Sequence, residues 1–466
     1  MERLLLVAAR ARKHWTLKEA ADRVGVNVNT LLRWEKNLAT PHAYNIQRLC
    51  EVYEVPSWEL GLDQDIVGTR AVSDATSINT VVMATMKYDL TMHLFTIVSD
   101  QRTYQEIQYQ VRQTLEDYDA MNRGNEAYRI KRREALQRLA TWPFAGSLYL
   151  STPEIDVRRP TDEIVAKCAA SIAACWELSK STDESDLAMA FQAVSAYIPS
   201  LNAIARDSSQ YRHAATNLLA QCYLFKTVLG WHLESLDRAT EYAQQAMQYG
   251  EETDDLPLQI TIHTQLSWIY YYAKRQKRSL EEIQRAAYLL KHSSTPMPPG
   301  LQSSVQSTLA IRQAMHGQRQ QALTSLRVAH ERFFISNTAD SRFIYVDYDR
   351  PSLVLEDGMT YAHLGLYQEA LDSFAQIVDP ETLSSKMPVA ERVRVEALNN
   401  QALALLKSPQ KNMEQAIKVW TAGIQEATKL QSSQRFNEAV TIYEIMEAVW
   451  PGEKRIEELR ELTAHW

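Results

Sequence analysis

Apolar side chains recur every three to four residues through most of the 466-residue chain, which is the spacing that places them on one face of an α-helix. No stretch alternates apolar and polar residues as a half-buried strand does. Residues 63–80 carry no apolar stripe and are predicted to form a linker. We therefore predict an all-α protein with an N-terminal domain at residues 1–62, connector or dimerisation helices within residues 81–150, and a helical body at residues 151–466.

Residues 16–41 predict two short helices joined by a tight turn. Small and apolar residues share one face of the first helix, and Gly25 then supplies a left-handed backbone turn. Asn27 is a good N-cap for the second helix, because its side-chain oxygen can accept the amide of Asn29 or Thr30. Leu31 and Trp34 point back to the first helix, so the opposite face is predicted to be exposed: Val28, Asn29, Leu32, Arg33 and Lys36.

The segment resembles the lambda-repressor-like (XRE) helix-turn-helix family, with its Gly-Val turn and the Thr-Leu-x-Arg-Trp-Glu sequence at residues 30–35. The resemblance implies a five-helix domain that binds double-stranded operator DNA, and it implies that Arg10 pairs with Glu35. The family usually places a glutamine against the phosphate backbone where this chain has Leu17, so Lys18 or Asn45 would substitute. The candidate DNA-binding residues are Lys18, Asn27, Val28, Asn29, Thr30, Leu32, Arg33 and Lys36.

The charge distribution favours the same interpretation. Residues 1–48 contain nine Lys or Arg against four acids, whereas the whole chain has a net charge of −7. A basic N-terminal domain on an acidic body suits contact with phosphate. The alternatives are a solvated pair of charged helices, or a helix-turn-helix used for protein contact.

A repeated helix-pair pattern runs from about residue 160 onward. Its clearest copy, residues 353–380, has the spacing of a tetratricopeptide repeat at Gly358, Tyr361, Gly365, Tyr367, Ala370 and Phe374. Weaker copies place the second helix of a pair at Ala239, Leu280, Ala322 and Ala416, with packing positions four residues later. The spacings exceed the ~34 residues usual for this repeat, so longer helices or links are expected. We predict an α-solenoid of tetratricopeptide-like pairs, with a non-repeating helical bundle as the alternative.

The first helix of each pair in such a solenoid lines the concave side, where peptides or partner helices lie. Amide side chains there can hydrogen-bond a peptide backbone, and a tryptophan can take an apolar side chain. The alternative is that these residues are ordinary surface amides and that the tryptophan is inter-helix core. The candidate ligand-binding residues are Asn217, Gln221, Gln265, Trp268, His363, Asn399 and Asn400.

No pattern in the sequence predicts catalysis, a cofactor or a metal site. Phosphate-loop, HExxH, CxxC and Gly-x-Ser-x-Gly motifs are missing from it. Cys168 and Cys175 share a helix face and are best read as small buried hydrophobes, and Asp347 and Asp349 alone make a weak metal site. The sequence shows no signal peptide or membrane span, so we expect a cytoplasmic protein that is not an enzyme.

The combination of an XRE-like domain and a tetratricopeptide body resembles bacterial peptide-sensing regulators of the Rgg and PlcR kind. That resemblance implies a transcriptional regulator whose body binds a peptide or protein ligand and changes operator binding. Paired heads read two half-sites, so a homodimer is expected. The alternative is an adaptor or scaffold of a signalling or defence system that uses the solenoid for protein contacts.

Overall fold

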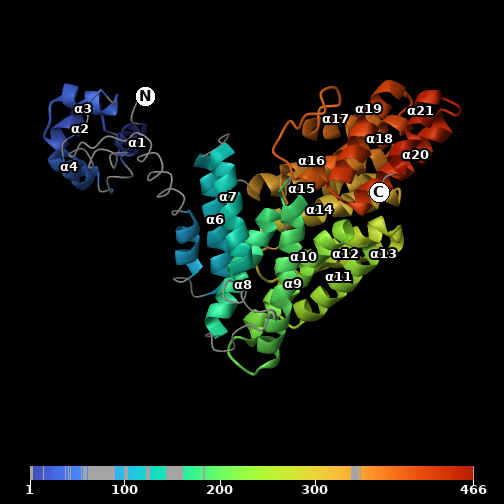
Figure 1. The fold of residues 1–466 in the computed structure, drawn as a ribbon, viewed down its shortest axis with the longest axis horizontal. Helices are drawn as coiled ribbons and strands as arrows, with labels where there is room; N and C mark the ends of the chain where they lie inside the picture. Colours follow the sequence, from blue (N-terminus) through green and yellow to red (C-terminus); the bar gives the residue numbers. More distant parts are fainter. Residues whose placement is uncertain are drawn as a thin grey trace. The chain divides into compact units, whose positions relative to one another are not determined.

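A computed structural model shows an all-α protein (Figure 1). The structure describes residues 4–60 with short gaps, 90–98, 103–121, 126–142, 161–336 except 182–183, and 345–464 except 346–347. Its contacts divide the chain into two compact units, Met1–Met83 and Ala84–Trp466. We call the first the head and the second the body. The predicted linker at residues 63–80 lies outside the described residues.

The head contains four helices within its described residues. These are α1 Leu4–Arg12, α2 Leu17–Val24, α3 Val28–Glu35 and α4 Ala43–Tyr53. Their apolar faces form one small core around Leu6, Leu31, Leu49 and Tyr53. Most of residues 54–62, where a fifth helix is expected, lie outside the described residues.

The body begins with helices that the sequence analysis treated as connectors. Residues 90–98 are helical, and α6 Tyr104–Met121 and α7 Glu126–Thr141 follow. Next come α8 Thr161–Leu178 and α9 Glu184–Arg206, against which α6 and α7 pack. Residues 81–89, the first part of the expected connector region, lie outside the described residues.

Helix pairs make up the rest of the body. They are α10 Arg212–Leu233 with α11 Leu236–Glu251, α12 Leu256–Tyr272 with α13 Gln276–Lys291, α14 Pro299–Met315 with α15 Arg319–Ser336, α16 Arg350–His363 with α17 Tyr367–Ile377, and α18 Glu391–Lys407 with α19 Met413–Lys429. The chain then continues through α20 Ser433–Val449 and the short helices α21 Lys454–Glu458 and α22 Arg460–Thr463. The predicted stack of helix pairs is thus confirmed.

The clearest predicted repeat has the packing that its sequence indicates. Gly358 in α16 faces the ring of Phe374 in α17, and a Cβ built on Gly358 would lie 2.3 Å from a ring carbon. Only glycine permits an approach that close. Gly317 and Gly365 adopt left-handed conformations, with φ of 71° and 74°, at equivalent turns between paired helices.

The repeat register was wrong by one residue in α13. Leu280 was expected at the packing position and Gln284 four residues later, but Leu280 is only half-buried and Gln284 is exposed. Ser279 and Ile283 are fully buried instead. Ser279 donates to the Ser267 carbonyl of α12 at 2.7 Å, and this bond lets a polar residue take the place of the expected alanine or leucine.

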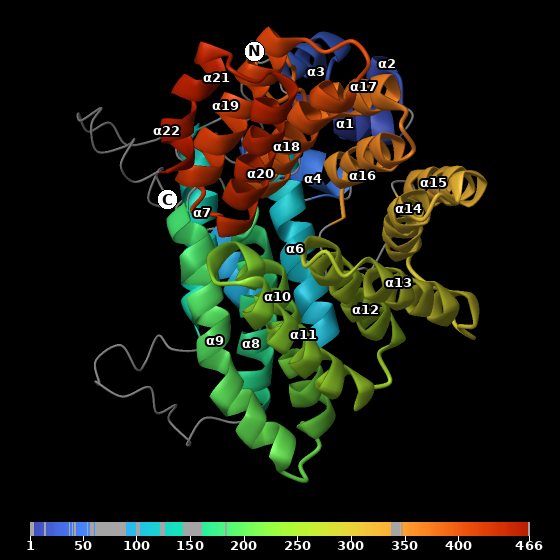
Figure 2. The same cartoon turned by 90° about the vertical axis from the view of Figure 1, so that its right-hand side faces the viewer.

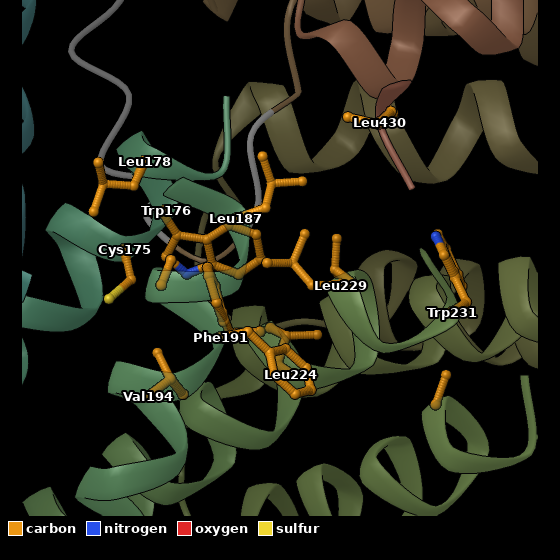
Figure 3. Packing of buried hydrophobic residues seen from close by; sticks show 14 of the residues in the cluster. Cys175, Trp176, Leu178, Leu187, Phe191, Val194, Leu224, Leu229, Trp231 and Leu430 are labelled. Carbon is orange, nitrogen blue, oxygen red and sulfur yellow. The ribbon is translucent and has the colours of Figure 1, made fainter. Parts of the chain in front are cut away.

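A large apolar core joins the first helices of the body to the last (Figure 3). Trp176 of α8 lies against Phe225 of α10 in an edge-to-face arrangement with ring centroids 4.8 Å apart. Leu187 and Phe191 of α9 belong to the same cluster, as does Leu430 at the end of α19. The C-terminal pairs therefore share a core with the N-terminal ones.

The inner helices of the body contact one another in a closed cycle. Contacts run from α10 to α12, α14, α16, α18 and α20, and then from α20 back to α10. Figure 2 shows α20 next to α10. At the point of closure, Nδ1 of His232 lies 2.8 Å from the hydroxyl of Ser432, and both residues are buried. The sequence analysis had expected an open concave surface.

One helix in the described part of the chain, over Ser185–Arg206, is long and apolar enough by composition to span a membrane. It lies within α9, whose Leu187, Val194 and Leu201 are buried in the body core. Core helices of water-soluble proteins pass the same test of length and composition, so this finding carries little weight against the expectation of no membrane span.

Candidate functional site

The helix-turn-helix of the head is built by local interactions that the sequence encodes. Thr16 caps α2 through a reciprocal bond with Glu19, in which the Thr16 amide donates to the Glu19 carboxylate at 2.8 Å. Gly25 ends α2 in the left-handed conformation with φ of 80°. The Asn27 side chain accepts the Asn29 amide at 2.9 Å and starts α3. The predicted turn and cap are confirmed.

The outer side of α3 offers polar and basic side chains to solvent. Asn27, Asn29, Arg33 and Lys36 are exposed, whereas Leu31 and Trp34 are buried against the head core. The remaining candidates on α3, Val28, Thr30 and Leu32, are half-buried. An arginine and an asparagine one turn apart can each make a bidentate bond to a base edge, the arginine to guanine and the asparagine to adenine.

An ion pair fixes the head around α3. Arg10 of α1 donates to both carboxylate oxygens of Glu35, at 2.7 and 3.0 Å. The Glu35 side chain is only 5% exposed, and its hydrogen bond to Arg10 raises the guanidinium pKa above its ordinary value. The family resemblance implied this pair, and the structure contains it.

Contacts near the start of α2 bear on phosphate binding. Leu17 is half-buried, Lys18 is exposed and Asn45 on α4 is half-buried, so Lys18 offers its charge to solvent most freely. The guanidinium carbon of Arg23 lies 4.5 Å from the centre of the Trp15 ring. The sequence analysis did not single out this cation–π contact, although the basic residue eight positions after a tryptophan was visible in it.

Asn217 and Gln221 on α10 do not face an open surface, contrary to expectation. Both are at most 1% exposed, and Gln221 donates to the Asn217 oxygen at 2.8 Å. Asn217 donates to Asp255, and Gln108 of α6 donates to the Gln221 oxygen at 2.8 Å. Helix α6 therefore takes up the hydrogen-bonding capacity that was assigned to a ligand.

Asn399 and Asn400 on α18 are also engaged within the chain. Asn399 is 2% exposed and donates to the Arg435 carbonyl of α20 at 3.0 Å. Asn400 is half-buried and donates to the Glu396 carbonyl one turn earlier at 2.9 Å. Helix α20 therefore covers Asn399, which was expected on an open concave surface.

The remaining three candidates lie around the aromatic residues of α12. Gln265 is buried. Trp268 is half-buried and stacks on Tyr272, one turn later in the same helix, with ring centroids 5.9 Å apart. His363 of α16 is exposed, and its Nε2 lies 3.4 Å from the Tyr271 hydroxyl. Of the seven candidates, His363 alone keeps an exposed side chain.

Two buried arginines fill the inside of the cycle of inner helices, and sequence analysis missed both. Arg312 of α14 is 0% exposed and lies 4.4 Å from the ring centres of both Trp268 and Tyr271. Arg435 of α20 pairs with Glu396 and, at 2.7 Å, with Glu438. Burial opposes the charge of Arg435, yet these carboxylates hold its pKa well above the ordinary value. A lone arginine on a helix gives no sequence signal of burial.

The cysteines and acids of the chain do not assemble a metal site in the described residues. Cys168 and Cys175 are buried, and burial raises the pKa of each thiol to about 12. Such thiols are unreactive at neutral pH. Asp349 caps α16 by accepting the Ser352 amide at 3.0 Å, which gives this residue a structural role. Asp347 lies outside the described residues.

Comparison with known proteins identifies the head. A family model described as helix-turn-helix matches residues 6–57. No curated protein matches the chain. Among solved structures, a signal transduction ATPase with numerous domains that carries a tetratricopeptide repeat sensor, from Pyrococcus horikoshii, is similar at 11% identity with a TM-score of 0.38. The match covers 92% of this chain and 59% of that one, so the chain spans less than two thirds of that protein.

The fold and the family match at residues 6–57 together define the class of the protein. It has an N-terminal helix-turn-helix domain of the XRE type and an all-α body of stacked helix pairs. No enzymatic domain is identified in it by the family comparison.

Proposed function

We propose that the protein is a cytoplasmic transcriptional regulator that binds operator DNA as a homodimer, and that its body couples a peptide or protein ligand to DNA binding. The observation that carries the proposal is the exposed face of α3. Asn29 and Arg33 stand on a capped helix, while the opposite side of the same helix is anchored in the head core. A recognition helix needs this combination of free base-reading side chains and a rigid support.

Dimerisation follows from the size of the reading surface. One head with a single recognition helix buries too little surface for operator-level affinity, whereas two heads read two half-sites. The proposal therefore includes an operator with repeated half-sites and a salt-dependent affinity.

The test uses full-length protein and DNA selected from a random pool. Arg33→Ala and Asn29→Ala should each lower specific binding by roughly 1–3 kcal/mol, because each removes contacts to a base edge. Arg206→Ala removes the same charge from an exposed position at the end of α9 and serves as the matched control. Equal affinity of all three variants for the selected DNA would contradict the assignment of α3.

An adaptor that binds other proteins remains the second candidate function. The closed inner helices leave less concave surface than an open solenoid, while two large apolar side chains are exposed on outer helices, Tyr288 of α13 and Phe334 of α15. Exposed aromatic residues are enriched at protein interfaces. Selection that recovers no preferred DNA sequence with full-length protein would favour this second function.

A further inference from the structure

A groove lies in the body between two neighbouring helix pairs. Its volume is about 670 Å³, enough for several amino-acid residues. One wall is α17, with Leu371 and Ala375, and the other is the start of α19, with Met413. Its floor is the C-terminal part of α18, with Gln401 and Leu405. None of the seven residues predicted to bind ligand lines it.

The floor of this groove contains a polar side chain whose oxygen lacks a hydrogen-bond partner. Gln401 is 1% exposed, and its Oε1 has no hydrogen-bond partner in the described part of the protein. A buried amide oxygen without a partner is costly, by an amount comparable to a lost hydrogen bond. The terminal amide torsion of glutamine is soft, so a modest rotation turns the carboxamide toward an occupant of the groove. That occupant would need an N–H donor.

The wall formed by α19 favours a negative group. Asn412 caps this 17-residue helix, with its side chain accepting the Gln415 amide at 3.1 Å and its carbonyl accepting the Ala416 amide at 3.0 Å. Met413 and Glu414 are the first two residues of α19, so their backbone amides lie at the positive end of the helix dipole. Lys411 adds a full positive charge to the same side of the groove.

Of the two acidic side chains of the groove, Glu414 pairs with Arg455. Asp372 lies on the α17 wall, opposite the start of α19, where it accepts a hydrogen bond from Gln368 at 3.0 Å and keeps its charge. The groove therefore offers a carboxamide on its floor, apolar contacts on its walls, and a helix N-terminus with a lysine at one end.

We propose that this groove binds the C-terminal end of a peptide. The terminal carboxylate lies at the start of α19 beside Lys411, and a backbone N–H of the peptide donates to Gln401. The side chains of the peptide contact Leu371, Leu405 and Met413 on the walls and floor. This inference rests on the proposed ligand-sensing function and names the site and the chemistry of the ligand.

The test measures binding directly, without DNA, by saturation-transfer NMR on full-length protein. The probe is a pool of N-acetylated tetrapeptides of random sequence, offered either with free C-terminal carboxylates or with amidated C-termini. We expect saturation transfer from the protein to the peptides of the free-acid pool. The amidated pool should bind at least tenfold more weakly. N-acetyl amino acids form a third arm, and binding of these as tight as that of tetrapeptides would overturn the assignment to a peptide.

Variants at the two ends of α19 provide a matched comparison. Lys411→Glu should abolish binding of the free-acid pool, whereas Lys429→Glu, at the exposed far end of the same helix, should leave it unchanged. Gln401→Leu should weaken binding at least tenfold without lowering the melting temperature, since it removes a buried amide oxygen that has no hydrogen-bond partner. Equal binding of both pools, equal behaviour of the two lysine variants, or no saturation transfer at millimolar pool would each overturn the proposal.

Failure of the groove as a peptide site can be distinguished from failure of the proposed sensing function. If peptides bind in the groove and operator affinity does not change, the sensing function fails and the site stands. If native peptides change operator affinity of the Lys411→Glu variant as much as that of the unaltered protein, the sensing function stands and this site is wrong.

Discussion

At the residue scale, Glu356 of α16 shows how burial changes an acid. It is 6% exposed, and Thr308 donates to its carboxyl group at 3.2 Å. Burial raises the pKa of Glu356 to about 8, although hydrogen bonds and the nearby charge of Arg312 act in the opposite direction. The folded protein therefore holds a proton here that the unfolded chain releases near pH 4.5.

This pKa predicts a pH dependence of stability. Since the folded state binds the extra proton between about pH 4.5 and 8, the contribution of Glu356 to the free energy of unfolding falls as pH rises through that window and is constant above it. Glu356→Gln keeps the hydrogen-bonding shape and cannot titrate. Denaturant unfolding of both proteins at pH 5.5 and 8.5 should show that the variant gains relative stability at the higher pH. A constant difference between them would contradict the raised pKa.

Sequence reasoning at this scale succeeded where a residue acts on its immediate neighbours. Asn27 and Gly25 act within two or three positions of themselves, so their roles as cap and turn are local properties. The roles of Gln221 and Asn399 depend on α6 and α20, which lie more than 30 positions away in the chain. An amide has the same sequence signature whether it meets a ligand or another helix.

At the element scale, the close packing of α16 against α17 requires glycine at position 358. Gly358→Ala places a methyl group against the Phe374 ring, and overpacking of this kind costs typically ~1–3 kcal/mol. Gly250→Ala in α11 is the matched control, because its Cβ would meet only the end of the Ile262 side chain at 3.0 Å. We expect Gly358→Ala to lower the free energy of unfolding and Gly250→Ala to leave it unchanged or raise it. Denaturant unfolding measures both.

A second substitution tests the cause. Phe374→Leu, combined with Gly358→Ala, removes the ring atoms that the new methyl group would meet, so the double variant should lose less stability than the sum of the single variants. Strict additivity would mean that the two residues do not contact each other.

The helix pairs were predictable because each packing position repeats along the chain. Ala239, Ala322, Ala370 and Ala416 are all fully buried, as the pattern required. The error of register in α13 arose because Ser279 is a buried polar residue whose hydroxyl donates to a backbone carbonyl. A hydrophobic pattern does not detect such a residue.

At the scale of the whole body, Arg435 holds the last inner helix in the cycle. It pairs with Glu396 of α18 and donates to the Tyr272 hydroxyl of α12 at 3.3 Å. Arg435→Met leaves Glu396 buried without its partner, and loss of one member of a buried pair costs about 3–5 kcal/mol. Arg460→Met, which breaks an exposed pair with Glu447, should cost at most about 1 kcal/mol.

Hydrogen exchange locates the effect of that substitution. Faster exchange in Arg435→Met should extend over α20 and over α12 and α18, because Arg435 bonds to side chains of both helices. Exchange confined to α20 would show that the cycle does not close through this residue.

Closure of the inner helices was beyond the reach of sequence analysis. It depends on the small rotation between successive helix pairs, summed over the whole stack, and no single repeat records that sum. The sequence showed only that the repeats are longer than usual, which was taken as longer helices or links and not as a change of curvature.

The last prediction concerns coupling between body and head. A ligand shifts operator affinity only if it binds one arrangement of the protein more tightly than another. For coupling of typical size, ~1–3 kcal/mol, a peptide that binds the groove should change operator affinity of the full-length protein about 5- to 150-fold. Lys411→Glu should abolish the response, while Lys429→Glu retains it and both bind operator equally without peptide. Fluorescence anisotropy of labelled operator DNA measures each case. An unchanged operator affinity at saturating peptide would leave the body as a protein-binding scaffold.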